Sequence, residues 1–470
     1  MVEVDSDALR TPPAVPPFRD DQGEIDGAFV AAVADAIDTG DALRVRALTA
    51  DLHEADLGGL IECLRPEQRP RLIELLGEDF DFAALTEVDD AVREEILEQL
   101  KPETVVEGMR ELESDDAVYI LEDLDEEDQA EILEKLPAGE RITLQRSLDY
   151  PEDSAGRRMQ TEFIAVPAFW TVGQTIDFMR ETEDLPETFY EIFVVDPGYH
   201  LVGTVPLDKL LRSKRPVTIR EIMSEEPDVV RATDDQEDVA RLFQRYNLVS
   251  AAVVDEAHRL VGVIMIDDIV DVIQEEADAD IKALGGVGEE EELSDTVWDT
   301  VKSRFPWLFA NLVTALIAAN VIDLFEKSIE RMVALAVLMP IVASMGGNAG
   351  TQSMTVTVRA LATRELRRSN ASRLVRRELA VGLLNGLGFA LVLGSVAVAW
   401  FGVRDLGVVV GLAILTVLTA AALGGILIPL VLDRLGVDPA VSSGPFVTTV
   451  TDVVGFFTFL GLATLWFGLG

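Results

Sequence analysis

Cysteine and lysine are scarce in this sequence, which bounds both its chemistry and its surroundings. The 470 residues include one cysteine, Cys63, so an intramolecular disulfide framework is impossible. Cys63 lies on an apolar helical stripe, which predicts a buried structural thiol. Seven of the 39 basic residues are lysine, whereas acidic residues number 84. Such a composition is typical of proteins from a salt-rich cytoplasm, where surface carboxylates hold hydrated cations.

An apolar segment is also missing from the start of the chain. Residues 1–26 are polar and contain several prolines, without the apolar core of a signal peptide. This composition predicts a disordered tail rather than a folded element.

Charge is divided unevenly along the chain. Residues 301–470 hold nine acidic and thirteen basic side chains, a net charge of +4. The first 300 residues therefore hold 75 acidic and 26 basic side chains, a net charge of −49. This division predicts that the first part lies in water and the second in lipid. A field this negative disfavours nucleic acid as a partner and favours cations.

An internal repeat occupies the first third of the chain. Leu60-Ile-Glu-Cys-Leu-Arg-Pro-Glu67 recurs as Ile96-Leu-Glu-Gln-Leu-Lys-Pro-Glu103 and again as Ile132-Leu-Glu-Lys-Leu-Pro137. The period of 36 residues is within the range of helical-hairpin repeats. Proline after each leucine ends a helix, and the apolar pairs can stack on neighbouring units. Residues 27–148 are therefore predicted to form a small α-helical solenoid.

A second repeat follows. Val194-Val-Asp196 and Leu201-Val-Gly203 match Val253-Val-Asp255 and Leu260-Val-Gly262, displaced by 59 residues. Each copy has the pattern β-α-β-β-α with a turn between the paired strands. This arrangement resembles tandem CBS domains over residues 149–275, with copies at about 155–217 and 218–275.

CBS pairs commonly bind adenine nucleotides through a Ser or Thr and an Asp that follow the glycine. The first copy has Pro206 and Lys209 at those positions, with Asp208 one place early. The second copy has Met265 in place of the hydroxyl, but Asp268 is present. The resemblance leaves ATP or another adenine nucleotide as an open alternative ligand, with Asp268 as its candidate residue.

Five apolar segments follow a connecting region at residues 276–305, which includes the acidic run Glu289–Glu292 and an amphipathic stretch suited to the membrane surface. The segments are Trp307–Phe325, Val333–Ala362, Leu379–Phe401, Leu406–Leu432 and Gly444–Leu469. Each is long enough to cross a bilayer, which needs about 20 residues. Seven arginines lie in or beside the connection between the second and third segments. By the positive-inside tendency this connection and the N-terminal part are cytoplasmic, and the C-terminus is outside.

Asp452 lies inside the last apolar segment, and no other charge accompanies it there. An ionised carboxylate at such depth costs about 2.5–3.5 kcal/mol on insertion scales, and such residues usually mark an ion route. The alternative is a neutral or paired aspartate. The second segment contains Pro340 and a glycine-rich stretch through Gln352. This pattern predicts either a kinked helix that turns carbonyls and amides toward a cavity or a helix-packing face.

Three stretches together are specific: Pro340–Gln352, Asp438–Pro445 and Thr448–Gly455 resemble the MgtE-type magnesium channels. The order of solenoid, CBS pair, connecting helix and five spans also resembles that family. The implied fold is multidomain: an α-helical solenoid, an α/β tandem CBS pair and an all-α transmembrane domain of five helices over residues 306–470. The resemblance also implies a homodimer in the cell membrane and a channel rather than an enzyme.

The resemblance assigns roles to individual residues. Asp452 matches the carboxylate that helps hold hydrated Mg²⁺ in the pore, with Gly346, Gly347, Asn348 and Gln352 as lining candidates. Regulatory Mg²⁺ would bind in the soluble part and close the pore when the ion is abundant. The matching acidic positions are Asp235, Glu237, Asp268, Asp271, Glu276, Asp280 and Asp438. For each soluble carboxylate, a solvated surface position is the alternative.

Two departures from the family pattern bear on sensing. Asn247 stands where the family usually has Asp, and Ala279 replaces an expected Glu, which predicts weaker regulatory sites. Two rival functions also stay open. The first is transport of another divalent cation, Co²⁺ or Mn²⁺, whose ligands are similar. The second is a membrane-anchored CBS sensor that does not conduct.

Overall fold

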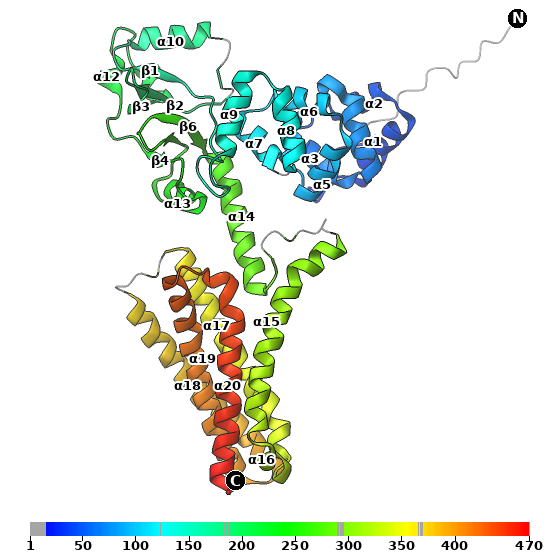
Figure 1. Ribbon diagram of the computed structural model, residues 1–470, viewed down its shortest axis with the longest axis vertical. Helices are drawn as coiled ribbons and strands as arrows, with labels where there is room; N and C mark the ends of the chain where they lie inside the picture. The colour runs from blue at the N-terminus through cyan, green and yellow to red at the C-terminus, as the bar shows by residue number, and fades with distance from the viewer. Residues whose placement is uncertain are drawn as a thin grey trace, which may run out of the picture. The chain divides into compact units, whose positions relative to one another are not determined.

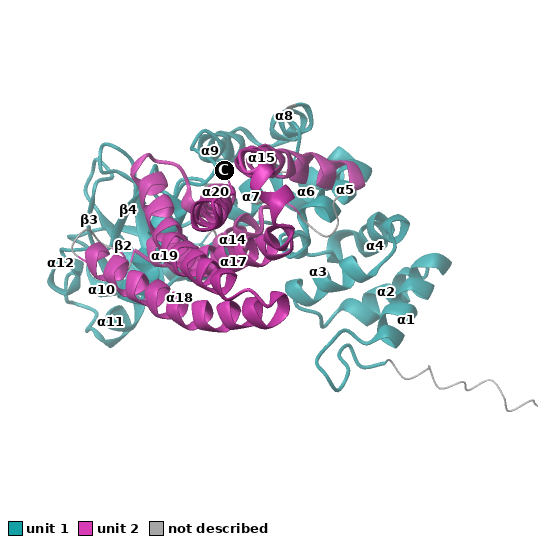
Figure 2. Cartoon of the chain, turned by 90° about the horizontal axis from the view of Figure 1, so that it is seen from below, with its two compact units in different colours: residues 1–275 teal, residues 276–470 magenta. Residues whose placement is uncertain are grey.

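The chain divides into two compact units, residues 1–275 and residues 276–470 (Figure 2). The computed structural model describes residues 16–469 apart from 123, 183, 184, 187, 289, 290, 292–295, 365 and 367–369. Most of the predicted N-terminal tail and most of the acidic run Glu289–Glu292 lie outside the described residues.

The first unit begins with short helices that repeat at a fixed interval. The helices α3 (Glu54–Cys63), α5 (Asp90–Gln99) and α8 (Glu126–Lys135) begin 36 residues apart, which confirms the helical repeat. The others are α1 (Gly27–Thr39), α2 (Ala42–Thr49), α4 (Arg69–Leu76), α6 (Pro102–Met109), α7 (Ser114–Glu122) and α9 (Ala138–Leu148), with 3-10 turns at Pro66–Gln68, Gly77–Asp79 and Phe82–Leu85. Leu60, Ile96 and Ile132 occupy equivalent buried positions in one continuous core. Cys63 ends α3 and is exposed, so the prediction of a buried thiol was wrong.

Two small sheets of identical topology follow (Figure 1). The elements of the first copy are β1 (Ala165–Pro167), α10 (Val172–Glu181), β2 (Glu191–Val195), β3 (Leu201–Pro206), α11 (Leu207–Arg212) and α12 (Ile219–Ile222). The second copy contains β4 (Val229–Arg231), α13 (Gln236–Tyr246), β5 (Ser250–Val254), β6 (Leu260–Met265) and α14 (Ile266–Gly285). In each sheet the first two strands are parallel and the last two form an antiparallel hairpin. The β-α-β-β-α prediction is confirmed.

Among its described residues, the second unit contains helices and the turns that join them, without a strand. Five helices there are long and apolar enough to span a membrane: α15 (Val297–Asp323), α17 (Ala334–Ala362), α18 (Ala371–Phe401), α19 (Arg404–Arg434) and α20 (Pro439–Phe467). A short helix, α16 (Glu326–Arg331), joins the first two. The helix α19 packs against α17, α18 and α20 (Figure 1). The buried centre of this bundle includes Val342, Val417 and Phe459.

Two local features of the second unit bear on the expectations from sequence. The amphipathic stretch does not form a separate surface helix, because residues 297–305 are the first turns of α15. The helix α17 is assigned without a break from Ala334 to Ala362, with Pro340 and the glycines inside it. Pro340 withholds one donor from the helix ladder, and the helix continues on both sides of that single gap. The carbonyls of Gly346 and Gly347 lie in regular helix, where i to i+4 bonding uses them.

Candidate ion pathway and acidic cluster

Glycines bring α17 close to α19 and α20. A Cβ atom on Gly346 would lie 2.6 Å from Cγ1 of Val417, and one on Gly350 would lie 2.8 Å from Cγ1 of Val447. Both glycines are buried, so small residues permit this approach as they do in other membrane helices. Gly346 therefore lies in a packing face, which was the alternative to its role in lining a pore.

Asp452 lies near the middle of α20, beside this packing face. Its neighbour Thr451 is buried and faces Gly346 and Gly350 on α17. Asp452 itself is half-buried, and no residue in the described part of the chain forms an ion pair or hydrogen bond with it. A carboxylate at this depth without a partner among the described residues needs water, a cation or a second chain.

The other predicted pore residues lie on a different side of α17. Asn348 and Gln352 are exposed and four residues apart, and the exposed Ser344, which was not predicted, extends them into one polar stripe along the helix. Gly347 has nothing within 4 Å of the position that a Cβ would occupy. This stripe would face hydrocarbon if the chain were alone in the bilayer, which is unfavourable for amide side chains.

A second intramembrane carboxylate escaped the sequence analysis. Glu378 on α18 is buried, and the hydroxyl of Ser353 on α17 donates a hydrogen bond of 3.1 Å to its Oε2. Arg377 lies 3.8 Å from its other oxygen. Glu378 directly precedes the third apolar run and follows two arginines. These neighbours are typical of a residue on the cytoplasmic surface, so the sequence did not indicate its burial.

In the first unit, acidic side chains gather where α7 faces α14. Asp115 and Asp116 lie in the first turn of α7, and Asp267 and Asp268 lie in the first turn of α14. The N-terminal end of a helix carries a partial positive charge, so both positions suit carboxylates. Asp271 lies one turn further along α14. We call these five residues the acidic cluster.

Burial and mutual repulsion raise the pKa values in the acidic cluster. Burial raises the pKa of Asp115 well above its usual range, and the carboxylate of Asp268 adds to this shift. Burial, followed by repulsion from Glu113, raises the pKa of Asp116 to about 7. Burial and then Asp267 raise the pKa of Asp268, and the same two causes raise that of Asp271. The buried Oδ2 atom of Asp268 has no hydrogen-bond partner among the described residues.

The donor set of the acidic cluster fits a hydrated magnesium ion. No group of three or more His, Cys, Asp or Glu side chains within the described ranges has the geometry to enclose a metal. Mg²⁺ does not require such a cage, because it keeps several waters and commonly binds through one or two carboxylates. The unpartnered Oδ2 atom of Asp268 is an oxygen of the required kind, aimed among like charges.

The remaining predicted regulatory residues are not all part of this cluster. Asp235 caps α13 and accepts a hydrogen bond of 2.9 Å from the backbone N–H of Glu237. Glu237 forms an ion pair with Arg241 on the same helix. Asp438 caps α20 and accepts 2.7 Å from the N–H of Ala440. Glu276 and Asp280 lie further along α14. Asp268 and Asp271 are thus the predicted pair that the structure brings together.

The two departures from the family pattern have different surroundings. Asn247 ends α13 in the left-handed conformation, with φ of 53°, and its N–H bonds to the carbonyl of Phe243. Asparagine tolerates this conformation better than most residues, which gives Asn247 a structural role. Ala279 lies half-buried on α14 and supplies no ligand atom.

The far end of α14 contacts α17 and α20. Ala283 near its C-terminus packs in a small apolar cluster with Met354 and Val358 of α17 and with Ala440 and Val447 of α20. The first turn of the same helix carries Asp267 and Asp268. One continuous helix therefore bears the acidic cluster at one end and contacts the helices of the candidate pathway at the other.

The predicted nucleotide residue lies in the acidic cluster. A small cavity in the CBS region is lined from both sheets by residues that include Tyr190, Ser250 and Met265, and its volume is about 10 Å³. Asp268 does not belong to its lining.

Comparisons with known proteins agree with this architecture. Residues 339–462 match a family model described as a divalent cation transporter, residues 52–153 match the MgtE intracellular N domain, and residues 219–275 match the CBS domain. The magnesium transporter MgtE of Thermus thermophilus is 34% identical over 452 residues, covering 92% of this chain and 97% of that protein. The MgtE of Bacillus subtilis is 30% identical over 419 residues, covering 89% and 93%.

Among solved structures, the cytosolic domain of the Mg²⁺ channel MgtE in complex with ATP is 31% identical, with a TM-score of 0.48. The match covers 52% of this chain and 99% of the chain in that structure. Matches over nearly the full length of both sequences establish the relationship. The chain belongs to the MgtE family, a family of transporters rather than of enzymes.

Proposed function

We propose that this protein conducts Mg²⁺ across the cell membrane along a path that passes Asp452. The observation that carries the proposal is a half-buried carboxylate in the middle of a spanning helix, without a partner among the described residues. The names of the relatives support magnesium as the ion. One carboxylate can hold a hydrated ion through its waters without removing its shell, which suits an ion that dehydrates reluctantly.

The conducting form is proposed to be a homodimer. The polar stripe of Ser344, Asn348 and Gln352 on α17 is exposed within a span, where lipid is a poor environment for amides. A second copy of the chain would cover this stripe and contribute a second Asp452. Two carboxylates with amide and hydroxyl oxygens supply the oxygen-rich surroundings that magnesium prefers.

Cytosolic Mg²⁺ is proposed to close this path by binding at the acidic cluster. Without a cation, the carboxylates of α7 and α14 repel one another, and this repulsion favours their separation. A bridging ion removes the repulsion and stabilises the contact between the helical repeats and α14. Because Ala283 near the end of α14 packs on α17 and α20, the position of α14 can bias those helices.

The proposed orientation follows the arginines. Arg359, Arg364, Arg373, Arg376 and Arg377 lie at the ends of α17 and α18 that meet at their connection. Positive residues near short connections favour the cytoplasmic side. The acidic first unit is then cytoplasmic, where it can sense the ion that has entered, and the C-terminus is outside.

Ion flux into liposomes tests the proposal. Reconstituted protein should admit Mg²⁺ down its gradient, and admission of Mn²⁺ or Co²⁺ in preference to Mg²⁺ would establish the rival divalent specificity. A protein that binds Mg²⁺ without conducting any divalent cation would instead be the membrane-anchored sensor. Unchanged Mg²⁺ influx after substitution of Asp452 would contradict the proposed path.

An adenine nucleotide is a further candidate ligand of the CBS pair. The cavity lined by Tyr190, Ser250 and Met265 is about as large as one water, so a base could enter only after side chains move. Titration of ATP into the wild type and into Tyr190→Ala, followed by calorimetry, would test this site. Equal heats from both proteins would place the nucleotide elsewhere.

A further inference from the structure

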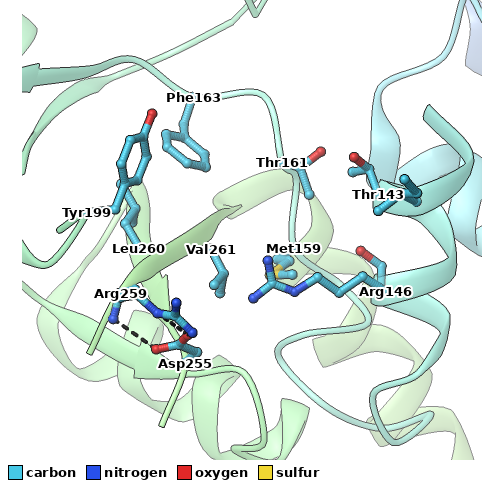
Figure 3. Close-up of a pocket in the computed structure, with 12 residues that line it drawn as sticks. Thr143, Arg146, Met159, Thr161, Phe163, Tyr199, Asp255, Arg259, Leu260 and Val261 are labelled. Atoms are coloured by element: carbon cyan, nitrogen blue, oxygen red, sulfur yellow. Dashed lines mark hydrogen bonds and ion pairs between the residues drawn. The ribbon is translucent and has the colours of Figure 1, made fainter. Parts of the chain in front are cut away.

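A separate cavity lies between α9 and the two β-hairpins, and it has a volume of about 490 Å³ (Figure 3). Its walls come from two parts of the first unit. Thr143, Arg146 and Ser147 belong to α9, while Asp255, Arg259 and Val261 come from the β5–β6 hairpin. Small-molecule sites commonly have volumes of about 300–1,000 Å³, so this cavity is large enough for an organic ligand.

The charge of this cavity is opposite to that of its surroundings. Its charged lining residues are Arg146, Arg259 and Asp255, which give a net charge of +1. The first 300 residues of the chain, in contrast, have a net charge of −49. Asp255 is already occupied, because its Oδ2 accepts from Nε of Arg259 at 2.9 Å and lies 2.7 Å from Nη2. The cationic excess therefore resides on Arg146, which makes no ion pair within the described part of the chain.

The polar groups of α9 are directed toward the same space. Figure 3 shows the side chain of Arg146 extending from α9 toward Met159 and Val261. The neighbouring Ser147 lines the cavity and is 1% exposed, and its hydroxyl oxygen has no hydrogen-bond partner among the described residues. A buried hydroxyl without a partner costs free energy that a bound acceptor would recover. The cavity thus contains one unpaired cation and one unsatisfied donor on adjacent residues.

The remaining lining suits a flat apolar group. Met159 and Leu260 are buried, and Phe163 and Tyr199 border the cavity on the side of the first sheet. Tyr199 lies in the turn between β2 and β3 with φ of 65°, and its carbonyl accepts a hydrogen bond of 3.0 Å from the N–H of Leu260. This bond fixes the turn beside the cavity. Aromatic faces and a thioether favour stacking with a planar ring.

We propose that this cavity binds a small aromatic anion. Its phosphate or carboxylate group would pair with Arg146 and accept from the Ser147 hydroxyl, and its ring would lie against Met159, Phe163 and Tyr199. The site is independent of the proposed magnesium path, because none of its lining residues belongs to the acidic cluster or to the spanning helices. A ligand there would join α9 to the second hairpin.

Binding of 1-naphthyl phosphate to the full-length protein in magnesium-free detergent solution tests this proposal, followed by the change in the probe's fluorescence. The wild type should bind the probe, and 1-naphthol, which has the same ring without the anion, should bind at least about tenfold more weakly. Arg146→Gln should weaken binding of the phosphate about tenfold or more, and Ser147→Ala should weaken it several-fold.

Two variants serve as controls. Arg141→Gln removes a charge from the same helix at a residue that does not line the cavity, and it should bind like the wild type. Tyr190→Ala alters the smaller cavity and should also leave binding unchanged. Absence of binding to the wild type, equal binding to Arg146→Gln, or loss of binding in Tyr190→Ala would each overturn the proposal.

Discussion

Asp115 on α7 and Asp268 on α14 bring two carboxylates together where the helical repeats meet α14. Burial raises the pKa of Asp115, and the nearby Asp268 raises it further. Asp268 keeps one buried oxygen without a hydrogen-bond partner among the described residues. This unfavourable pair is what a divalent cation would relieve, and the proposed control of the pore depends on it.

Neutralising Asp268 should reduce the effect of internal magnesium. Asp268→Asn removes the charge of a candidate ligand and also part of the repulsion between the carboxylates. Internal Mg²⁺ should therefore shift the balance between the open and closed states less than it does in the wild type. Allosteric couplings are typically about 1–3 kcal/mol. The ratio of flux without internal Mg²⁺ to flux with it should therefore fall about fivefold or more.

A matched control lies on the same helix. Asp278 is exposed on α14, outside the acidic cluster, so Asp278→Asn changes the net charge equally. It should retain the wild-type flux ratio. An unchanged ratio in Asp268→Asn, measured in liposomes with set internal magnesium, would show that the acidic cluster does not regulate the path.

The acidic cluster should also make stability depend on pH. The folded protein holds protons on Asp116 up to about pH 7, whereas an ordinary aspartate loses its proton near 3.8. In this interval the folded state binds more protons than the unfolded state, so the free energy of unfolding falls as pH rises. Without Mg²⁺, the melting temperature of the soluble region should decrease from about pH 5 to pH 8.

Magnesium should reverse this loss, because the cation replaces the protons. Calorimetry of the full-length protein at several pH values, with and without Mg²⁺, measures both effects. Stability that rises toward pH 8 in the absence of magnesium would contradict the proposed arrangement of the acidic cluster.

Close packing in the membrane unit predicts a selective effect of alanine. A Cβ on Gly425 of α19 would lie 2.5 Å from the carbonyl oxygen of Gly350 and 2.8 Å from Cβ of Ser353. Gly425→Ala should therefore destabilise the bundle by about 1–3 kcal/mol and lower its melting temperature in detergent. Gly388→Ala on α18 meets nothing within 4 Å and serves as the control.

Gly388→Ala should leave the melting temperature unchanged or raise it slightly, since alanine favours helix over glycine. Equal melting temperatures for the two variants would mean that α17 and α19 do not approach as closely as described.

Much of the fold could be predicted because its signals repeat. Leu60 and Ile96 recur at a fixed interval, and the structure places both in equivalent buried positions. The paired Val-Val-Asp motifs likewise predict two matching hairpins, which the sheets confirm. A helix broken at Pro340 could not be excluded from sequence, because the effect of one missing donor depends on how neighbouring helices support the segment.

The acidic cluster was only partly predictable. Asp268 and Asp271 were expected, but Asp267 was not, and Asp115 and Asp116 belong to one of many acidic runs in a strongly acidic sequence. Asp115 and Asp116 differ from the other acidic runs because α7 packs near α14 and buries them. This packing cannot be predicted from the local sequence. Asn247 was interpreted from sequence only as a missing ligand. The structure gives asparagine another role there, because residue 247 has a left-handed backbone at the end of α13.

Flux in liposomes tests most directly whether magnesium passes Asp452. Asp452→Ala should lower Mg²⁺ influx at least about tenfold, because the apolar run Gly444–Leu469 contains no other charged residue that could hold the ion. Asp405→Ala removes an exposed carboxylate from the first turn of α19 and should conduct like the wild type. Wild-type influx through a well-folded Asp452→Ala protein would contradict the account.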